Sequence, residues 1–396
     1  MHQPTQSATT FDRSDKLGAV DALRGYAILL VLCAHTTAHI PGLVWPAKRL
    51  VLLGVYGVQL FFLASAVTLL MSWARNEKPF ATRCKEFFIH RFLRIAPLYF
   101  LAIGFYWLAY GHSANDFSAQ VLAATLLFYN AWSPYLIPTL PGWQPVPGGW
   151  SIGVEFCFYF IFPLLAVSVT SLRRAAVYVV IGLLVMLAAS TLGQAWYPEI
   201  GVEERANFLY FLPLNHLPVF ALGFLLYHCL KSETIRQKVL VSRIGSNSAS
   251  VLLLAAIVVL SLLGTRKTFD WHSGMPPTHI MISICFVLWA LVVLVRPGRL
   301  VVNPAIVAFG RVSFSVYILH FAMLKVTALA LERIWPFAVT GIASVAYWCV
   351  MMMVAGGLTF ALAKLTYRAI EKPFIDLGKR ITRRAPAATP VVAPQV

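Results

Sequence analysis

One apolar stretch near the N-terminus carries three ionisable side chains. It reads LGAVDALRGYAILLVLCAH, from Leu17 to His35, and contains Asp21, Arg24 and His35. A charge or an imidazole at membrane depth is costly unless it is paired or faces water, so such groups often mark functional sites. Arg24 and His35 are three helical turns apart, roughly 16 Å along the axis. The spacing predicts one helix face with a cation near a membrane surface and a base near mid-depth. A polar stripe that only packs against other helices is the alternative.

Glu155 is a second intramembrane candidate, in the segment WSIGVEFCFYFIFPLL. It lies about one and a half turns inside a span that enters from the side opposite to the His35 helix. At comparable depth the two side chains would meet, as in the general-base arrangement of acyl transfer. We therefore expect His35 to act as a catalytic base or transient acyl acceptor, since the ordinary histidine pKa of about 6.5 suits this role. A structural hydrogen bond between helices is the simpler alternative.

Two arginines stand at the mouth of a further span, in RFLRIAPLYF. Arg91 and Arg94 are one helical turn apart, and two guanidinium groups on one face suit a phosphate-rich ligand. Basic residues that anchor a span or contact lipid headgroups have the same pattern. The spacing alone leaves both interpretations open.

Two other spans carry polar residues. Ser65 lies mid-span in GVQLFFLASAV, where a hydroxyl often bonds to its own helix. Tyr317 and His320, in FGRVSFSVYILH, are three residues apart and share a helix face. His216 lies in another span, where a lone polar residue is more often a helix contact than a site residue.

The composition is that of an integral membrane protein. The chain has 396 residues, of which 59% are hydrophobic and 12% are charged, whereas soluble domains are typically about 25% charged. The net charge of +17 could suggest nucleic acid, but the basic residues fall in short segments between apolar spans. This placement fits membrane topology, and no nucleic-acid partner is expected.

The apolar pattern predicts an all-α protein with about ten transmembrane helices. An eleventh run, 119–132, is too short to cross and is expected to be interfacial or re-entrant. The predicted spans are 17–39, 51–73, 95–111, 150–168, 175–191, 207–229, 249–265, 278–295, 312–332 and 341–363.

Lysine and arginine placement predicts the orientation of these spans. If the N-terminus is cytoplasmic and the spans alternate, twenty-four of the 32 basic residues lie in inner segments and six in outer segments. This bias places both termini in the cytoplasm. Counting 119–132 as a crossing would move Arg173 and Arg174 outside, which argues against an eleventh span.

One membrane domain is expected, over residues 17–380, between a polar tail at 1–16 and a disordered, Pro/Ala-rich tail at 381–396. The first 16 residues carry no signal-peptide pattern. The six cysteines have no spacing typical of disulfides or zinc ligands, so no metal site is expected.

In these motifs the chain resembles the acyltransferase type 3 family, bacterial membrane proteins that O-acylate polysaccharides, lipopolysaccharide and other glycans. The resemblance runs from Asp21 to Phe374, in the order of the family. The second-span motif departs from the family pattern, because Ala66 stands where a glycine is usual. The matching segments are DALRGYAILLVLCAH, GVQLFFLASAV, RFLRIAPLY, GGWSIGVEFCFYFIFP, FGRVSFSVYILH and YRAIEKPF.

The resemblance implies a multi-pass protein of the bacterial cytoplasmic (inner) membrane that uses cytoplasmic acyl-CoA, often acetyl-CoA, as donor. Its acceptor would be a glycan or glycolipid on the outer side. His35 would be catalytic, Arg24, Arg91 and Arg94 would hold the donor phosphates, and Trp150, Ser151 and Glu155 would border the acceptor side. We also expect Ser65 on the donor side and Tyr317 and His320 on the substrate side.

The resemblance leaves partners open. Some relatives carry a fused hydrolase-like domain, so this unit would act alone, as a homo-oligomer, or with a partner protein that handles acyl groups. A proton-coupled transporter or flippase that uses Arg24, Glu155 and His320 is the alternative function. No inverted repeat is visible to favour it. A lipid-linked glycosyltransferase would need acidic motifs in outer loops, and 133–149 has no acidic residue.

Overall fold

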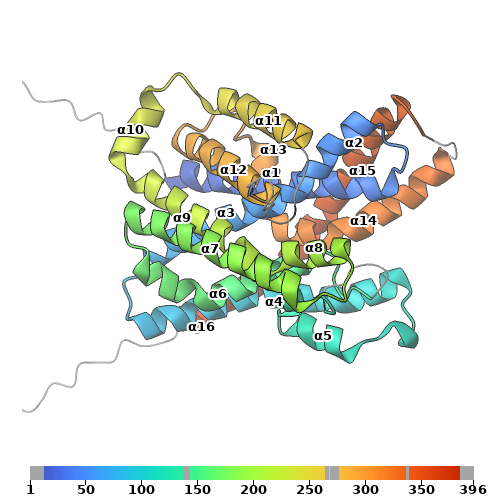
Figure 1. Ribbon diagram of the computed structural model, residues 1–396, viewed down its shortest axis with the longest axis horizontal. Coiled ribbons are helices and arrows are strands. Elements are labelled where there is room, and N and C mark those ends of the chain that lie inside the picture. Colours follow the sequence, from blue (N-terminus) through green and yellow to red (C-terminus); the bar gives the residue numbers. More distant parts are fainter. Residues whose placement is uncertain (1–12, 137–142, 264–266, 268–275, 336–338, 384–396) are drawn as a thin grey trace, which may run out of the picture.

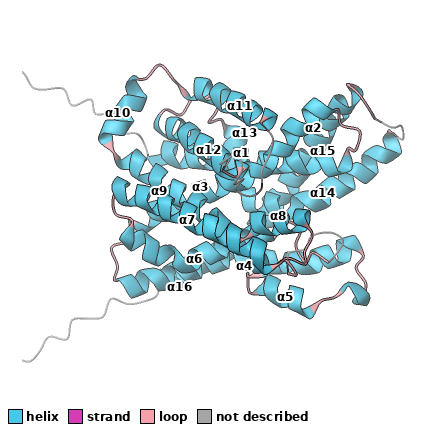
Figure 2. Cartoon of the chain, viewed as in Figure 1, coloured by secondary structure: helices cyan, strands magenta, loops and turns pink. Residues whose placement is uncertain are grey.

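The described chain is helical throughout, with short 3₁₀ and π segments and no strand among its residues. The computed structural model describes residues 13–136, 143–263, 267, 276–335 and 339–383. Figures 1 and 2 show long helices running along the molecule's longest axis, with shorter helices at the two ends. The α-helices are α1 (Arg13–His35), α2 (Trp45–Leu52), α3 (Gly57–Trp73), α4 (Phe80–Tyr110), α5 (Ala119–Leu126), α6 (Trp150–Ser168), α7 (Leu172–Trp196), α8 (Val202–Phe211), α9 (Leu217–Lys231), α10 (Glu233–Val241), α11 (Ser246–Leu262), α12 (Thr278–Val295), α13 (Pro304–Arg311), α14 (Ser313–Ile334), α15 (Ala343–Thr366) and α16 (Lys372–Arg383).

Nine helical segments of the described chain are long and apolar enough to cross a membrane. A tenth crossing is reached only if α10 and α11, which meet at a 92° bend, are taken as one broken span. This agrees with the predicted architecture of about ten spans. Helices suit a bilayer because each backbone group is satisfied within its own segment.

The structure adds detail to three local predictions. The predicted span 95–111 belongs to a much longer helix, α4, which already begins at Phe80 and includes the basic segment before it. The run 119–132 forms the eight-residue α5 and a 3₁₀ turn, too short to cross, as expected. The tails lie mostly outside the described residues, but α16 continues to Arg383, past the predicted boundary at 380.

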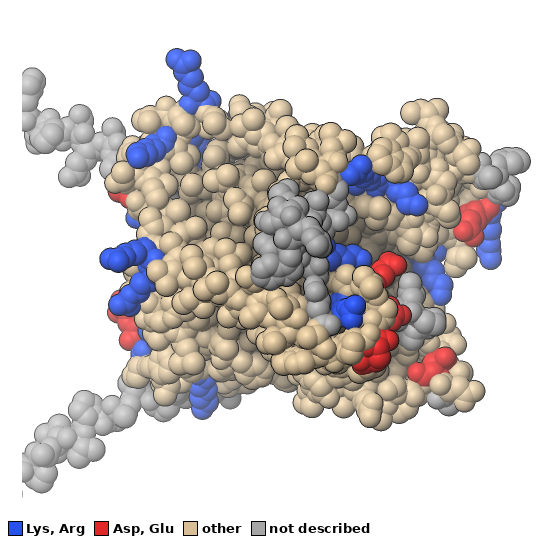
Figure 3. Space-filling model, viewed as in Figure 1, with Lys and Arg blue, Asp and Glu red and all other residues tan. Residues whose placement is uncertain are grey.

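Contacts between loops support the predicted alternation of the spans. Segments expected on the inner side meet each other: Arg296 Nη1 donates to Ser242 O at 2.8 Å. Segments expected on the outer side also meet: Tyr135 OH donates to Glu199 Oε1 at 2.6 Å. In Figure 3, basic side chains gather along the left edge of the visible face, beside a broad uncharged area.

Helix α1 lies at the centre of the bundle and packs against α3, α12, α13, α14 and α15. Its contact with α13 is very close, because a Cβ atom built on Gly310 would lie 1.7 Å from Asp21 O. Small residues allow such backbone approach between membrane helices. Through this contact α13 brings Arg311 to the N-terminal half of α1.

Candidate functional site

A cavity with a volume of about 80 Å³ lies between α1, α3, α4, α6 and α14. Seven of the ten predicted site residues line it. They are Arg24, Ser65, Arg91, Arg94, Ser151, Glu155 and Tyr317. The remaining lining residues are Val58, Phe61, Phe62, Ile95, Ile152, Tyr159, Ser313 and Phe314. The structure therefore brings residues that were predicted on separate helices together around one cavity.

Arg24 is held in place from two sides. Its Nη2 donates to Thr68 Oγ1 of α3 at 2.9 Å, and its Nη1 lies 3.8 Å from Asp21 Oδ1, one turn earlier in α1. The second carboxylate oxygen of Asp21 lies 3.5 Å from Arg311 Nε of α13. Asp21 thus braces two guanidinium groups. The roles of Thr68 and Arg311 depend on helix packing, so no sequence spacing indicated them.

Arg91 and Arg94 bring two more cations to the same cavity, from one face of α4. The Arg91 guanidinium lies 6.0 Å from the Phe87 ring centre, and its buried Nε has no hydrogen-bond partner among the described residues. Arg94 lies within electrostatic range of Asp21 and Glu371. Three guanidinium groups around one cavity repel one another, and a cluster of this kind suits an anionic ligand.

Glu371 is a residue whose environment the sequence did not indicate. It is 3% exposed and accepts a hydrogen bond from Ser315 Oγ. It ends a π-helical segment, Tyr367–Glu371, between α15 and α16. Insertions of this kind are frequent at functional sites. Here the segment places a carboxylate behind Arg94.

Glu155 is bonded to hydroxyl groups. Ser65 Oγ of α3 and Tyr159 OH, one turn further along α6, each donate to Glu155 Oε1 at 2.6 Å. Within the described chain Glu155 makes no hydrogen bond or ion pair with His35, so the expected meeting of these two side chains is wrong. Depth along two helices could be estimated from the sequence, but the direction of each side chain around its helix could not. The (i, i+4) spacing of Glu155 and Tyr159 is the sequence feature that indicates their hydrogen bond.

Ser151 and Tyr317 close the other part of the cavity. Tyr317 OH donates to Gly148 O at 2.9 Å and lies 2.6 Å from Ser151 Oγ, which is itself 3.2 Å from Gly148 O. Gly148 has a φ of +74°, and a Cβ atom there would lie 3.0 Å from Tyr317 OH. This loop conformation and this hydrogen bond therefore both favour glycine at position 148.

His35 and His320 form a pair next to this end, outside the cavity lining itself. Their ring centres are 5.1 Å apart, and the His320 ring centre is 5.6 Å from that of Tyr317. Each Nδ1 faces a carbonyl of its own helix: Val31 O at 2.8 Å from His35 and Tyr317 O at 2.6 Å from His320. A carbonyl only accepts, so each Nδ1 carries the proton and each neutral ring presents a basic Nε2. The buried Nε2 of His320 has no partner among the described residues.

Trp150 lies in a neighbouring aromatic cluster and does not line the cavity. Its ring centre is 5.6 Å from those of Tyr210 and His216, and His216 is 5.3 Å from His279. The Nδ1 atoms of both histidines are buried without a partner in the described chain. The sequence left His279 unassigned. The cluster meets the cavity through Phe62, whose ring centre is 5.3 Å from that of His216.

The comparisons with known proteins identify the family. A family model described as an acyltransferase domain matches residues 17–363. The chain belongs to the acyltransferase type 3 family. This chain is thus an O-acyltransferase with many apolar helices, a multi-pass membrane enzyme. Family membership favours the enzyme over the transporter or flippase alternative.

The relatives of this acyltransferase differ in length. Acyltransferase MdmB of Streptomyces mycarofaciens is 26% identical over 94% of this chain and 95% of its own length. A Staphylococcus aureus (strain COL) protein, named provisionally as an O-acetyltransferase, is 23% identical over 98% of this chain but only 62% of its own length. A Caenorhabditis elegans protein named regulator of hypoxia-inducible factor 1 is 26% identical over 39% of this chain and 34% of its own. No solved structure gives a significant match.

The family implies an acyl donor and an acceptor. Among the described residues no group of three or more histidine, cysteine, aspartate or glutamate side chains is arranged to hold a metal ion. The six cysteines are free thiols in the structure. The polar groups in and beside the cavity that suit acyl transfer are the histidine pair, the Glu155 carboxylate with its hydroxyl donors, and the arginine cluster.

Proposed function

We propose that this acyltransferase moves an acyl group, an acetyl group in the simplest case, from cytoplasmic acyl-CoA to a hydroxyl of a glycan or glycolipid across the membrane. The supporting observation is one cavity lined by Arg24, Arg91 and Arg94, with the His35–His320 pair next to its Tyr317 end. The arginines suit the donor phosphates, and the imidazoles suit proton transfer.

The distances fit the shape of coenzyme A. Arg24 and His35 lie on one helix, eleven residues apart, which is roughly 16 Å. The pantetheine arm of the donor is long enough to bring the thioester to this depth while its phosphates stay with the arginines. The structure therefore supports phosphate recognition at one end and chemistry at the other.

In the transfer step, His35 Nε2 takes the proton of the acceptor hydroxyl. The oxygen of this hydroxyl attacks the carbonyl carbon of the thioester at the same time. The carbon–sulfur bond then breaks, and the imidazolium returns the proton to the leaving thiolate. The products are an ester of the acceptor and free coenzyme A. Val31 O fixes the tautomer that this step needs.

Glu155 contributes negative charge within the same cavity. With Ser65 and Tyr159 donating to it, this carboxylate keeps a fixed position between the arginines and the Ser151–Tyr317 hydroxyls. We assign it an electrostatic and positioning role, in place of direct contact with His35. Trp150, beside the cavity, borders the acceptor side.

The deciding experiment uses the purified protein in nanodiscs with acetyl-CoA labelled in the acetyl group. The proposal expects release of coenzyme A and a labelled acceptor glycan or glycolipid from membranes that contain it, both lost in His35→Ala. Release that is equal in wild type and His35→Ala would contradict the proposed site. Mass spectrometry of surface glycans from a deletion strain identifies the acceptor.

A further inference from the structure

A second hollow adjoins the arginine cavity on the outside of the bundle. It is an apolar groove of about 500 Å³ between α4, α6 and α16, and we call it the lateral groove. Its walls are almost entirely hydrocarbon and aromatic. Its lining residues are Phe88, Ile89, Arg91, Phe92, Leu93, Phe156, Tyr159, Phe160 and Ile381.

Two side chains, Arg91 and Tyr159, line both the lateral groove and the arginine cavity. They therefore form the partition between an apolar space and a cationic one. Tyr159 is fixed by its hydrogen bond to Glu155 at 2.6 Å. The Arg91 guanidinium interacts with Tyr159, but its buried Nε has no hydrogen-bond partner among the described residues. A ligand that binds in both the lateral groove and the arginine cavity must combine a hydrocarbon chain with an anionic headgroup.

Helix α16 adds positive charge at the edge of the lateral groove. It carries Lys372, Lys379, Arg380 and Arg383 against a single acidic residue, Asp376, and Ile381 on its apolar side reaches the groove. A basic amphipathic helix of this kind lies at a membrane surface and attracts anionic lipids.

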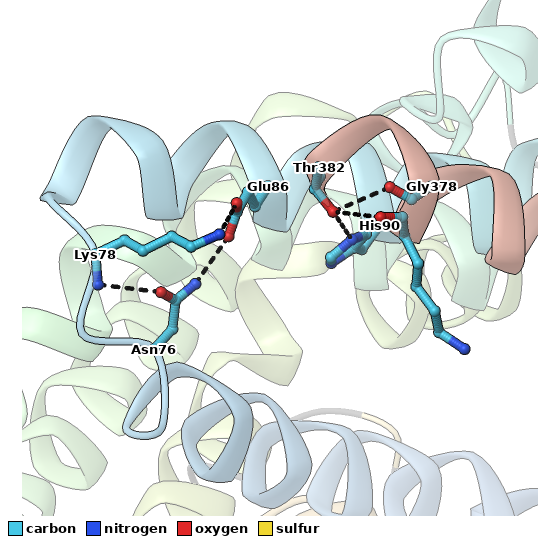
Figure 4. Close-up of polar contacts among 7 residues, drawn as sticks. Asn76, Lys78, Glu86, His90, Gly378 and Thr382 are labelled. Atoms are coloured by element: carbon cyan, nitrogen blue, oxygen red, sulfur yellow. Dashed lines mark hydrogen bonds and ion pairs between the residues drawn. The ribbon is translucent and has the colours of Figure 1, made fainter. Parts of the chain in front are cut away.

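Contacts drawn in Figure 4 hold α16 against α4. His90, the residue before Arg91, lies 3.0 Å from Thr382 Oγ1, and a Cβ atom on Gly378 would lie 3.3 Å from the His90 ring. Further back in α4, Glu86 accepts hydrogen bonds from Lys78 and Asn76. The groove is thus bounded by helices that are tied together, with its charged end fixed at Arg91.

We propose that an anionic phospholipid docks here, with one acyl chain in the lateral groove and its headgroup phosphate on Arg91. Resting on the proposed function, the same phosphate competes with the acyl donor for Arg91. The lipid composition of that leaflet then sets the apparent affinity for the donor.

The chain offers a matched control groove. Another apolar hollow, of about 430 Å³, lies beside α1, α11 and α12. Tyr26, Leu254 and Trp289 are among the residues that line it, and none of its lining residues is charged. Ordinary lipid contact would occupy both grooves alike, whereas headgroup recognition is expected only where Arg91 stands.

The test uses the full-length protein in nanodiscs that contain photoreactive phosphatidylglycerol or phosphatidylcholine with identical chains. Cross-linked peptides are mapped by mass spectrometry. We expect phosphatidylglycerol to exceed phosphatidylcholine by about tenfold in the lateral groove, as one charge-assisted contact predicts, and to equal it in the control groove. Equal yields of the two lipids in both grooves would overturn the proposal.

Variants at Arg91 and Ile89 separate the contribution of the Arg91 charge from that of the apolar groove, and a variant at Leu254 is the control. Arg91→Gln should abolish the phosphatidylglycerol preference without emptying the groove. Ile89→Trp should fill the groove and lower the cross-linking of both lipids there, while Leu254→Trp does the same only in the control groove. A headgroup preference that survives Arg91→Gln would contradict the assignment of the phosphate to this residue.

Coenzyme A binding tests the competition separately. We expect wild type to bind coenzyme A several-fold more weakly in phosphatidylglycerol than in phosphatidylcholine discs, with a smaller difference in Ile89→Trp. If the affinity for coenzyme A differed between the two lipids by the same factor in wild type and Ile89→Trp, general surface charge would explain the difference. Competition at Arg91 would then be excluded. If coenzyme A binds in neither lipid, the proposed donor is wrong, while the cross-linking result still decides the lipid site.

Discussion

His35 and His320 share one hydrogen-bonding arrangement, in which Nδ1 is bound to a carbonyl of the same helix. Both rings therefore present Nε2 as the free nitrogen, and the two rings lie 5.1 Å apart. Two neighbouring bases of this kind hold one proton far more readily than two. The pair is suited to accepting one proton from a hydroxyl group and returning it within the same turnover.

Replacement of His35 by alanine should abolish acyl transfer, because the proposed step assigns to His35 Nε2 the proton of the acceptor hydroxyl. Coenzyme A binding should stay within about twofold, since the arginine cluster is retained. The measurement is acetyl transfer beside a coenzyme A binding isotherm. His39→Ala, four residues away in a 3₁₀ turn, is the matched control and should keep transfer near wild type. Near-normal transfer in His35→Ala would remove His35 from the mechanism.

Glu155→Gln tests the carboxylate without changing its volume. Ser65 and Tyr159 both donate to Glu155 Oε1, so an amide oxygen can keep the bonds but not the negative charge. We expect turnover to fall by about 10² while the protein still reaches the membrane. Glu86→Gln is the control, because Glu86 is also buried but is bound to Lys78 and Asn76 away from the cavity. Wild-type turnover in Glu155→Gln would make Glu155 a purely structural residue.

Arg94→Ala should weaken donor binding by roughly tenfold to a hundredfold, the usual loss for one guanidinium–phosphate contact. Lysine should restore only part of it, because an ammonium lacks the two-pronged geometry of a guanidinium. Isothermal titration with coenzyme A measures both. Arg299→Ala, on the exposed segment between α12 and α13, is the control. Unchanged affinity in the alanine variants of Arg24, Arg91 and Arg94 alike would exclude these residues from the donor site.

At the scale of helices, the sequence predicted which elements carry the site but not how they face one another. A polar group inside an apolar span is visible in the sequence because it is costly there, and this is how Arg24 and Glu155 were found. Partners such as Thr68 and Glu371 depend on the rotation and approach of other helices. Neither is encoded in spacing along one segment, which is why the expected contact between Glu155 and His35 is wrong.

The α1–α13 contact gives a prediction at this scale. Gly310→Ala would place a Cβ atom 1.7 Å from Asp21 O, so the backbones must separate. We expect a loss of stability of about 1–3 kcal/mol or more, together with weaker coenzyme A binding, because Asp21 braces Arg24. Thermal unfolding in nanodiscs and coenzyme A titration are the measurements. Gly104→Ala in α4, where nothing lies within 4 Å, should be neutral. Equal melting temperatures of the two variants would contradict this account of the contact.

For the whole molecule, hydropathy predicted the helical architecture well because the bilayer allows few alternatives for a long apolar segment. The breaks were harder to predict. Hydropathy did not indicate the 92° bend between α10 and α11, which depends on packing. It also did not indicate that α4 begins at Phe80, because hydropathy alone assigns the basic segment before the span to a loop. The orientation in the membrane remains a prediction from lysine and arginine placement.

Cysteine accessibility can decide this orientation. In a variant without its six native cysteines, Ser113→Cys, between α4 and α5, should react with a membrane-impermeant maleimide added to intact bacterial cells. Arg380→Cys, on α16, should react only after permeabilisation, because the donor arginines lie at the same end of the bundle and coenzyme A is cytoplasmic. Labelling in the reverse order would place the arginine cavity outside, where it could not receive acyl-CoA. The proposed donor would then be wrong even if His35 were essential for transfer.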